Sequence, residues 1–378
     1  VSAANGVALG NGTSVTHAGS VALGNGSATA TAVGTTGTTI NGTAYTFAGT
    51  SPTSTISVGA AGAERTVTNV AAGRLTSTST DAVNGSQLYA TNTAIENLGD
   101  VVEANEIHYF SVNDNGVAGG NVNNDGAAGV NALAAGVNAS ATGASSTAVG
   151  HNSVASSLQN TAIGYNAQAT GNGFATAVGS RNVASDTGAS AVGSGNTAAG
   201  NSAQAFGVGN SATASSSAFG ISNIVSGSGS NAFGMMNTVT GTNANAFGIS
   251  NQVRQGLAVG SSNNVDSGMA IGYGNTVSGG GTALGNSATA SEAGAIAIGD
   301  ATQATAQDAV AIGVFADASH ARSVALGSYS TADGSTLANA AYSPTGDVND
   351  VAGIAPVGEV SVGSAVSGEQ RRITNVAA

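Results

Sequence analysis

The sequence lacks several of the residue types on which globular folds and common binding sites depend. It contains no cysteine, no tryptophan and no lysine, and only 3 prolines occur among its 378 residues. The absence of cysteine excludes a disulfide framework and any metal site built from thiolates. The absence of cysteine is compatible with a cytosolic protein and with an exported protein that avoids disulfides, so it does not indicate the location.

Charge is also scarce, and positive charge especially so. Charged residues make up 7% of the chain, and 19 acidic residues outnumber 7 basic ones, which gives a formal net charge of -12. No basic stripe is available to neutralise phosphates, so the composition argues against a nucleic acid as partner. Binding to an anionic membrane surface is disfavoured for the same reason.

Large apolar side chains are few, because most of the 41% hydrophobic residues are alanine and valine. Such a chain can fill only a thin core. Disordered chains of low complexity are typically charged and proline-rich, whereas this sequence has 58 glycines and a mean hydropathy of +0.14. These features favour an ordered structure built by repetition.

Long hydrophobic runs are missing as well. No segment is long and apolar enough for a membrane-spanning helix, and the amino-terminal VSAANGVALG has neither the basic nor the apolar part of a secretion signal. The chain starts and stops inside repeat-like sequence. We therefore expect a segment of a longer protein, whose targeting and anchoring signals lie outside it.

A tetrapeptide of the form x-Ala-aliphatic-Gly recurs along the chain, with Val, Ile, Leu or Phe at its third position. Its glycines recur between residues 136 and 327 at spacings of 12 to 15 residues, most often 14, and a shorter run has glycines at 10, 24 and 34. Fourteen residues accommodate two strands of about five residues and two tight turns of about two. The period therefore predicts a flattened β-solenoid in which each repeat forms one coil.

The residues between tetrapeptides are predicted to form the return strand and the turns of each coil. The hexapeptide NSATAS, at 210–215 and at 286–291, is typical of this part of the repeat. Asparagine and glycine are predicted at the turns, because both tolerate the left-handed backbone conformation. The coils that end at Gly260 and Gly272 are two residues short, and we expect them to lose part of the return strand and to have tightened turns.

Alternation within the tetrapeptide places alanine toward a narrow interior and its two neighbours on the outer face. About 14 coils spaced by about 4.8 Å would give an outer apolar column on the order of 65 to 70 Å long. An exposed stripe of that size predicts oligomerisation along it. The residues predicted at this interface are Phe206, Phe219, Phe233, Phe247, Ile271, Leu284, Ile298, Ile312 and Leu326.

The four phenylalanines of this column permit a second interpretation. They occupy the same position in four consecutive repeats, so they could also form an aromatic patch for a ligand. We favour the structural role, a stacked ladder within a subunit interface, because Val, Ile or Leu fills the same position in the other repeats.

Residues 64–99 do not follow the 14-residue rule. Their second half is helix-like, because Ser79 or Thr80 is a suitable N-cap and Asp81 would lie in the first turn. Apolar residues then follow at spacings that fit a heptad: Leu88, Ile95, Leu98 and Val102. The segment predicts a short coiled coil, and residues 368–378 repeat its beginning.

The sequence resembles the head and neck of YadA-like trimeric autotransporter adhesins. The stretch TNVAAG followed five residues later by STDAVNGSQL is similar to the neck of that family, the tetrapeptide repeats to its head, and residues 35–62 to an insert found before such necks. The resemblance implies a left-handed parallel β-roll in each chain of a homotrimer. It also implies an outer-membrane surface protein that adheres to host cells or extracellular matrix, with its membrane anchor outside this segment.

The resulting domain organisation is mainly all-β and has six parts. We expect a short β-roll at 1–34, an insert at 35–62, a neck with a helix at 63–99, a connector at 100–132, a long β-roll at 133–334, and a second insert with the start of a second neck at 335–378.

The sequence offers little evidence of a catalytic or metal site. His17, His108, His151 and His320 are scattered without partners at ligand spacing. Asp114 and Asp125 lie in NDNG and NNDG, which resemble calcium loops only faintly, and turn chemistry explains them better. We therefore predict no catalytic residue, no metal and no cofactor.

Asn92 has two possible roles that the sequence leaves open. It lies between Leu88 and Ile95, where it would form a core layer of a trimeric coiled coil, and the family resemblance implies that such layers can hold an anion. It would otherwise face outward.

The predicted function is therefore adhesion by a trimeric fibre, without enzymatic activity. Two other classes were weighed. An ice-binding solenoid needs a regular threonine ladder, whereas threonine is scattered here, and a left-handed β-helix acyltransferase needs a six-residue period and a catalytic histidine.

Overall fold

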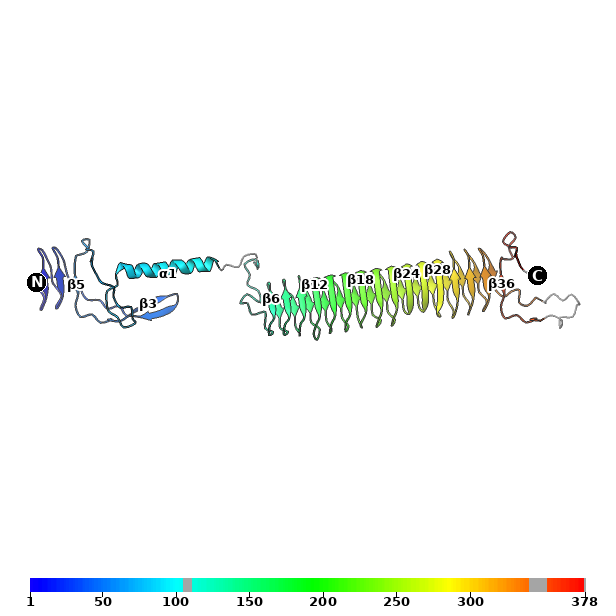
Figure 1. Cartoon of the computed structure of the whole chain (residues 1–378), viewed down its shortest axis with the longest axis horizontal. Helices are drawn as coiled ribbons and strands as arrows, with labels where there is room; N and C mark the ends of the chain where they lie inside the picture. Colours follow the sequence, from blue (N-terminus) through cyan, green and yellow to red (C-terminus); the bar gives the residue numbers. More distant parts are fainter. Residues whose placement is uncertain (105–110, 340–351, 377–378) are drawn as a thin grey trace. The chain divides into compact units, whose positions relative to one another are not determined.

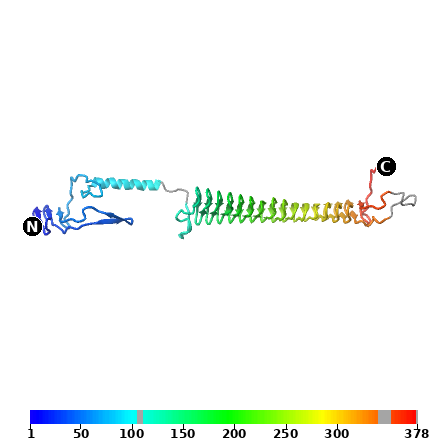
Figure 2. The same cartoon turned by 90° about the horizontal axis from the view of Figure 1, so that it is seen from below.

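The computed structural model describes residues 1–104, 111–339 and 352–376 of the chain. The chain divides into two compact units, residues 1–111 and 112–378. Each unit contains a parallel β-solenoid, and the second unit holds the longer one, whose coils follow one another in chain order (Figures 1 and 2).

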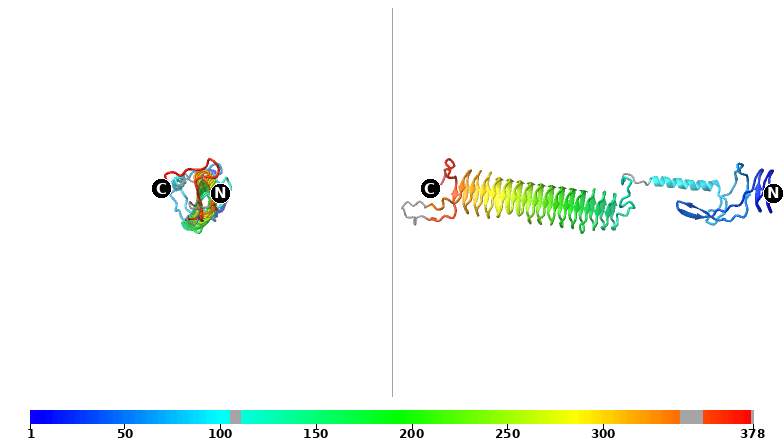
Figure 3. Two further views of the ribbon diagram at one scale, coloured as in Figure 1. Left: turned by 90° about the vertical axis from the view of Figure 1, so that its right-hand side faces the viewer. Right: turned by 180° about the vertical axis from the view of Figure 1, so that it is seen from behind.

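Two parallel sheets run the length of the long solenoid (Figure 3). Among the described residues, the first sheet contains β6 (Leu133–Ala135), β8 (Thr147–Val149), β10 (Thr161–Ile163), β12 (Thr176–Ser180), β14 (Ser190–Ser194), β16 (Gln204–Val208), β18 (Ser217–Ile221), β20 (Asn231–Met235), β22 (Asn245–Ile249), β24 (Gly256–Ser261), β26 (Gly268–Tyr273), β28 (Gly281–Asn286), β30 (Ile296–Ile298), β32 (Val310–Ile312), β34 (Val324–Leu326) and β36 (Val360–Ser361). These strands hold the tetrapeptides, apart from β36, which closes the sheet.

The second sheet is formed by the return strands, one in each coil. It contains β7 (Ser140–Ala141), β9 (Val154–Ala155), β11 (Gln168–Ala169), β13 (Val183–Ala184), β15 (Thr197–Ala198), β17 (Ser211–Ala212), β19 (Ile224–Val225), β21 (Thr238–Val239), β23 (Gln252–Val253), β25 (Asn264–Val265), β27 (Thr276–Val277), β29 (Thr289–Ala290), β31 (Gln303–Ala304), β33 (Asp317–Ala318) and β35 (Thr331–Ala332). The parallel solenoid predicted from the period is confirmed.

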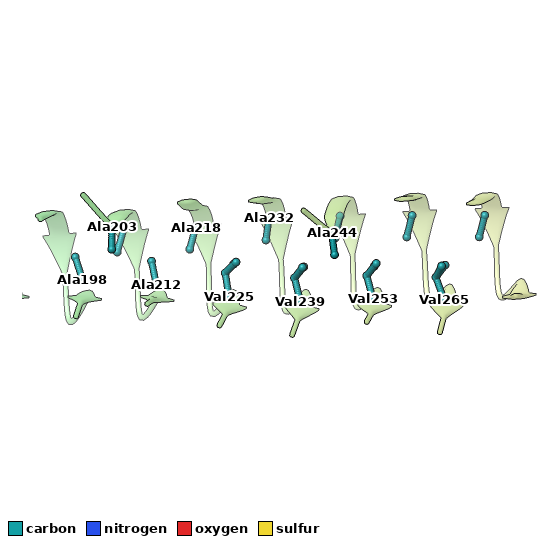
Figure 4. Close-up of a cluster of buried hydrophobic side chains, with 14 of the residues drawn as sticks. Ala198, Ala203, Ala212, Ala218, Val225, Ala232, Val239, Ala244, Val253 and Val265 are labelled. Atoms are coloured by element: carbon teal, nitrogen blue, oxygen red, sulfur yellow. The ribbon is translucent and has the colours of Figure 1, made fainter. Parts of the chain in front are cut away.

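Small side chains fill the space between the two sheets. In a typical coil the inward residues are Ala218, Asn223, Val225 and Ser230, all at most 1% exposed. Figure 4 shows alanines of the first sheet pointing toward valines of the second. The tetrapeptide alanines pair with one another from coil to coil, so the predicted alanine interior is confirmed.

The repeat glycine permits an approach between coils that no other residue allows. Gly234 has a φ of 126°, and a Cβ atom at this position would lie 1.9 Å from the carbonyl oxygen of Gly248 in the next coil. Both the backbone conformation and the contact therefore require glycine.

The return strands differ from the sequence prediction of about five residues, because each has two. Left-handed residues before and after the return strand, such as Ser222 and Gly229, turn the chain away and limit the ladder. Asparagine and glycine are not the only residues at these turns, since Met236 also has a positive φ.

The two short coils keep their return strands, so the predicted loss of part of that strand is wrong. Strands β23 and β25 are as long as their neighbours. The missing residues come from the turns at 254–255 and 266–267, after which β24 and β26 begin at Gly256 and Gly268, one residue before the tetrapeptide. The predicted tightening of the turns is confirmed.

A column of asparagines runs through the core of the long solenoid. Each lies three residues after a repeat glycine and is at most 1% exposed: Asn182, Asn196, Asn210, Asn223, Asn237, Asn251, Asn263 and Asn275. Asn237 Nδ2 donates to Asn223 Oδ1 at 2.9 Å and to the carbonyl oxygen of Gly248 at 2.8 Å. Asn237 Oδ1 accepts from the backbone and side-chain nitrogens of Asn251 at 3.1 and 2.9 Å.

This asparagine column changes the first sheet of the coils that carry it. Each Nδ2 donates a hydrogen bond to the carbonyl oxygen of the next repeat glycine. The first-sheet strands of these coils, β12 to β26, continue past the glycine and are five or six residues long. Strands β8, β10, β30, β32 and β34 have three. The predicted role of asparagine as a turn residue was therefore incomplete, because these side chains are core residues whose polar groups are satisfied.

The first unit holds a short solenoid and a helix. Strands β1 (Val7–Leu9), β2 (Val21–Leu23) and β5 (Ile56–Ser57) form its parallel sheet, and β3 (Gly37–Ile40) and β4 (Thr43–Thr46) form an antiparallel hairpin between β2 and β5. The predicted insert at 35–62 thus contains the hairpin and also β5.

The helix α1 (Gly85–Ala104) begins later than predicted, and its cap is Asn84 rather than Ser79 or Thr80. Asn84 Oδ1 accepts from the backbone nitrogen of Gln87 at 3.3 Å, and Gln87 Oε1 accepts from the backbone nitrogen of Asn84 at 3.2 Å. This reciprocal pair is a capping box.

Asp81 lies before this helix instead of in its first turn, because it pairs with Arg74 at 2.7 Å. This pairing lowers the pKa of the Asp81 carboxyl, mainly through the hydrogen bond from the Arg74 side chain and also through the one from its backbone. The pairing thus holds two segments of the neck together ahead of the helix.

The two solenoids end in the same arrangement of hydrogen bonds. Arg65 Nη1 donates to Ser27 Oγ and to the carbonyl oxygen of Val58. Arg371 Nη1 donates to Ser330 Oγ at 3.1 Å and to the carbonyl oxygen of Val362 at 2.8 Å. We call this arrangement the arginine closure, and in both places it ties the chain after the last strand to the last coil.

Asp317, on β33, has a buried acceptor atom without a hydrogen-bond partner among the described residues, its Oδ1. Burial raises the pKa of this carboxyl, the charge of Asp333 raises it further, and a hydrogen bond with Ser319 opposes both. The folded state therefore binds this proton more tightly than the unfolded chain does, so the group lowers stability as the pH rises above its ordinary pKa of about 3.9.

We expect Asp317→Asn to stabilise the folded chain at pH 7 by about 0.5 kcal/mol, a small value because the side chain is only partly buried. Below pH 3.9 the difference should vanish, since Asp317 is then protonated. Thermal melts at pH 3.5 and 7 measure this, with Asp300→Asn on an exposed turn as control. Equal melting temperatures at pH 7 would contradict the expectation.

Candidate functional site

The outer face of the first sheet carries a continuous apolar column. Ala232 is completely buried, so its neighbour Phe233 points outward, and this phenylalanine is 39% exposed. Strand register places the third-position residues of successive coils side by side. All nine predicted interface residues lie in this column: Phe206, Phe219, Phe233, Phe247, Ile271, Leu284, Ile298, Ile312 and Leu326.

The four phenylalanines of the column form a parallel stack within the chain. Ring centroids are 5.1 Å apart for Phe206 and Phe219, 4.9 Å for Phe219 and Phe233, and 5.2 Å for Phe233 and Phe247. Stacking covers the ring faces, and the ring edges remain open to a partner. The predicted ladder is confirmed, and its place in a subunit interface stays a prediction.

The second sheet presents a different chemistry on its outer face. Hydroxyl and amide side chains occupy the outward position of most return strands, as in Thr197, Thr238 and Gln252. A solenoid coil therefore has an apolar side and a polar side. The apolar side is suited to burial in an assembly and the polar side to contact with water.

Two aromatic clusters at the turns were not predicted. His151 stacks on Tyr165 with centroids 5.6 Å apart, and the Arg181 guanidinium lies 5.4 Å from the Tyr165 centroid. Phe315 and Tyr329 stack at 5.2 Å, and each is about half exposed. These residues follow repeat glycines by one or two positions, and this recurrence could have indicated the clusters.

The three histidines in the described part of the chain form ordinary hydrogen bonds at turns or lie at the surface. His17 Nδ1 lies 3.1 Å from Thr29 Oγ1, and His320 Nδ1 lies 3.2 Å from Ser323 Oγ. His108 falls outside the described residues. Throughout 1–104, 111–339 and 352–376, no three His, Asp or Glu side chains are arranged to hold a metal ion.

The acidic turns that resemble calcium loops are held by local hydrogen bonds. Asp114 Oδ1 accepts from the backbone nitrogen of Gly116 at 2.9 Å, and Asn121 Oδ1 accepts from that of Gly126 at 2.9 Å. Asp125 is exposed. This geometry agrees with turn chemistry.

A cleft of about 630 Å³ lies at the carboxyl end of the long solenoid. Its lining includes Thr331, Asp333, Glu359 and Arg371. The Glu359 carboxylate already accepts hydrogen bonds from the backbone of Gly334 and from a threonine hydroxyl, and Arg371 forms the closure. The polar groups of the cleft thus serve the fold.

Helix α1 has no buried residue in the single chain. Leu88, Ile95 and Leu98 are each about 60% exposed, so the predicted heptad face lacks a partner within the described residues of the unit. Asn92 is also exposed and lies four residues after Leu88, which places it beside that face. No helix in the described part of the chain is long and apolar enough to cross a membrane.

Comparison with protein families finds two matching profiles. Residues 66–106 match the coiled stalk of trimeric autotransporter adhesins. The YadA head domain repeat matches residues 2–27, 127–153, 161–173, 174–196, 280–302 and 304–330. The matches fall on both solenoids and on the helical neck between them.

Two similar proteins give the same kind of match over shorter stretches. The autotransporter adhesin BtaE of Brucella suis biovar 1 (strain 1330) is 62% identical over 80 residues, which are 21% of this chain and 11% of BtaE. The solved C-terminal YadA-like domain of BPSL2063 from Burkholderia pseudomallei is 55% identical, with a TM-score of 0.27. That match covers 27% of this chain and 50% of the solved one.

Proposed function

We propose, from the premise that this chain belongs to the YadA-like trimeric autotransporter adhesins, that it is part of the extracellular adhesive region of such a protein. Three copies associate in parallel and build a fibre on the outer surface of a bacterium. The fibre presents repeated surfaces to host cells or to extracellular matrix. Because the chain spans 11% of its relative BtaE, the activity and partners of the whole protein are part of this proposal.

One observation carries the trimer: the apolar column on the first sheet. Phe247, Leu284 and Leu326 are each more than 40% exposed in the single chain, and they belong to a row that continues from coil to coil. Exposed apolar stripes of this extent mark protein interfaces. The exposed heptad face of α1 supports the same assembly, because its apolar spacing fits a coiled coil.

The adhesive surface in this proposal is the polar side of the solenoid together with its turns. These parts remain outside when the first sheet faces the other copies. Each copy repeats similar coils, so weak individual contacts combine across three chains and many coils. No residue needs to act as a catalyst or to hold a cofactor. The adhesin matches favour neither an ice-binding protein nor an acyltransferase.

Sedimentation equilibrium at micromolar concentration tests the assembly. We expect a mass of about three times the 35.5 kDa of one chain, because a single chain leaves both apolar faces in water. A stably folded species of 35.5 kDa would contradict the trimer.

Binding to immobilised collagen, fibronectin and laminin and to cultured cells tests the adhesive role. We expect the trimer to bind at least one of them saturably, and a monomeric variant to bind about 100-fold more weakly through loss of multivalency. Absence of binding to the whole panel would contradict the role on these ligands. Equal affinity of monomer and trimer would contradict the multivalent mechanism.

A further inference from the structure

From β16 to β34 the apolar column of the first sheet is flanked in most coils by an apolar residue on one side, and that side changes along the solenoid. We number the residues of each tetrapeptide 1 to 4, so that alanine is 2 and glycine is 4, and the following residue is 5. From β16 to β22, position 5 is apolar: Val208, Ile221, Met235 and Ile249. Position 1 is polar in the same strands: Gln204, Ser217, Asn231 and Asn245.

From β24 onward the pattern is reversed. Position 1 is now mostly apolar: Leu257, Met269, Thr282, Ile296, Val310 and Val324. Position 5 is mostly polar, with Tyr273 and Val314 as exceptions: Ser261, Tyr273, Asn286, Asp300, Val314 and Ser328. Position 3 is apolar in both sections, so the column itself is continuous.

The change takes place in a single step between β22 and β24. Positions 1 and 5 exchange character in the pairs Asn245↔Leu257 and Ile249↔Ser261, while position 3 stays apolar in the pair Phe247↔Val259. The turn that leads into β24, residues 254–255, is the first of the two shortened turns. The switch therefore coincides with the place where the coil itself changes.

We propose that the face that contacts the other copies is oblique, using positions 3 and 5 from β16 to β22 and positions 1 and 3 from β24 to β34. The centre of the contact then moves along the strand by two residues, or about 6.6 Å. Three rolls that meet in this way shift their contact once, between β22 and β24, instead of keeping one contact line along their whole length. This inference rests on the proposed trimer and describes its geometry.

Exposure supports the position-5 flank as a contact surface, whereas apolar residues of the position-1 flank, such as Leu257 and Ile296, are only partly exposed. Val208, Ile221 and Ile249 are 52%, 48% and 44% exposed in the single chain, although large apolar residues are scarce in this protein. Their polar counterparts across the column, such as Ser217, would gain nothing from burial. The apolar flank therefore indicates which side of the column is covered.

The occupant that fits this pattern is a second copy in the same direction. In a parallel copy related by rotation about the fibre axis, each section meets the same section of its neighbour. In an antiparallel copy, the aromatic section with its flank at position 5 would meet a section with its flank at position 1, and polar residues would oppose apolar ones. The pattern thus selects a rotation axis along the solenoid.

Single cysteines give a clean test, because the chain contains no cysteine of its own. Residues near a rotation axis lie close to their own copies, so a short thiol cross-linker joins them. We expect efficient cross-linking for Ile221→Cys and Ile296→Cys, and at least about five-fold less for the matched controls Ser217→Cys and Asp300→Cys. Phe219→Cys and Ile298→Cys, at position 3, should cross-link in both sections.

A second set of single cysteines covers the case in which one of these variants fails to fold. Val208→Cys and Val310→Cys should each cross-link to their own copies, and Gln204→Cys and Asn286→Cys are the controls. If position 3 cross-links in both sections, and the same flanking position, 1 or 5, also cross-links in both, the oblique contact is overturned and the trimer is still supported. No cross-linking at position 3 in either section would overturn the trimer itself, and the oblique contact with it.

Discussion

Phe233→Asp is expected to dissociate the trimer at micromolar concentration. The substitution removes the middle of the phenylalanine stack, since Phe233 contacts Phe219 and Phe247 at 4.9 and 5.2 Å. It also places a carboxylate of each copy near the proposed axis, where an unpaired buried charge costs about 3 to 5 kcal/mol. Sedimentation measures the mass, and we expect the melting temperature to fall by about 10 °C.

Two matched variants separate the interface from the fold. Thr240→Asp adds the same charge to an exposed position just after β21, on the polar side, and should leave mass and melting temperature unchanged. Phe233→Leu keeps an apolar residue where Leu284 and Leu326 occur naturally, and should keep the trimer. If Phe233→Asp and Thr240→Asp both have the melting temperature of the unsubstituted chain, the first sheet is not the interface.

Asn237→Ala is expected to destabilise the folded chain by about 3 kcal/mol. The change leaves the carbonyl of Gly248 and two nitrogens of Asn251 without the partners they now have at 2.8 to 3.1 Å. Each buried group left unpaired costs about 1 to 3 kcal/mol. Urea unfolding, followed by circular dichroism at fixed chain concentration, measures the loss.

Alanine is a fair replacement at this position because Ala288 and Ala316 occupy it in other coils, where they are buried. The control is Asn231→Ala in the same coil, because the Asn231 side chain lies on the outer face and bonds to Asn245 there. This control should change stability by less than about 0.5 kcal/mol. Equal effects of the two variants would show that the column contributes no more than a surface pair.

Much of the long solenoid follows from the tetrapeptide alone. The order alanine, branched or aromatic residue, glycine determines which side chain enters the core and where the backbone adopts a positive φ. Ala232 and Phe233 occupy the predicted interior and outer face, whereas Gly234, predicted at a turn, lies within β20 and has a positive φ there. This part was predictable because a thin core admits only small residues.

The asparagine column was missed because asparagine serves two purposes in this protein. Asn243 is a left-handed turn residue with a φ of 56°, whereas Asn237 is buried in the core. Composition does not separate these roles. Position separates them, since a buried asparagine lies three residues after each repeat glycine from Gly179 to Gly272.

The hexapeptide NSATAS shows why local sequence is not sufficient. In 210–215 its asparagine is a member of the core column, and Ala212 lies on the return strand. In 286–291 its asparagine ends a first-sheet strand, and Ala288 takes the place of the core asparagine. The same hexapeptide thus lies two positions apart in the coil, and only the distance from the repeat glycine, Gly207 or Gly285, distinguishes the two cases.

The helix cap illustrates a different limit. The start of a helix suits each of Ser79, Thr80 and Asp81. The Asp81 carboxylate, however, forms an ion pair with Arg74 before the helix begins. Asn84 with Gln87 then provides a cap that satisfies two backbone nitrogens instead of one. The proposed subunit interface lies outside what one chain's sequence and structure contain, because its partner would be another chain.

The arginine closure has a consequence for how such a protein can change its length. The chain leaves and re-enters each last coil at joined points, for example where Thr55 Oγ1 donates to the carbonyl oxygen of Ala30 at 2.9 Å. Whatever residues intervene, the sheet resumes in register and the arginine finds the same acceptors. A solenoid, its closure and its neck therefore form one transferable cassette. Evolution can lengthen a fibre by duplicating that cassette, and can vary the insert within it, without redesigning either junction.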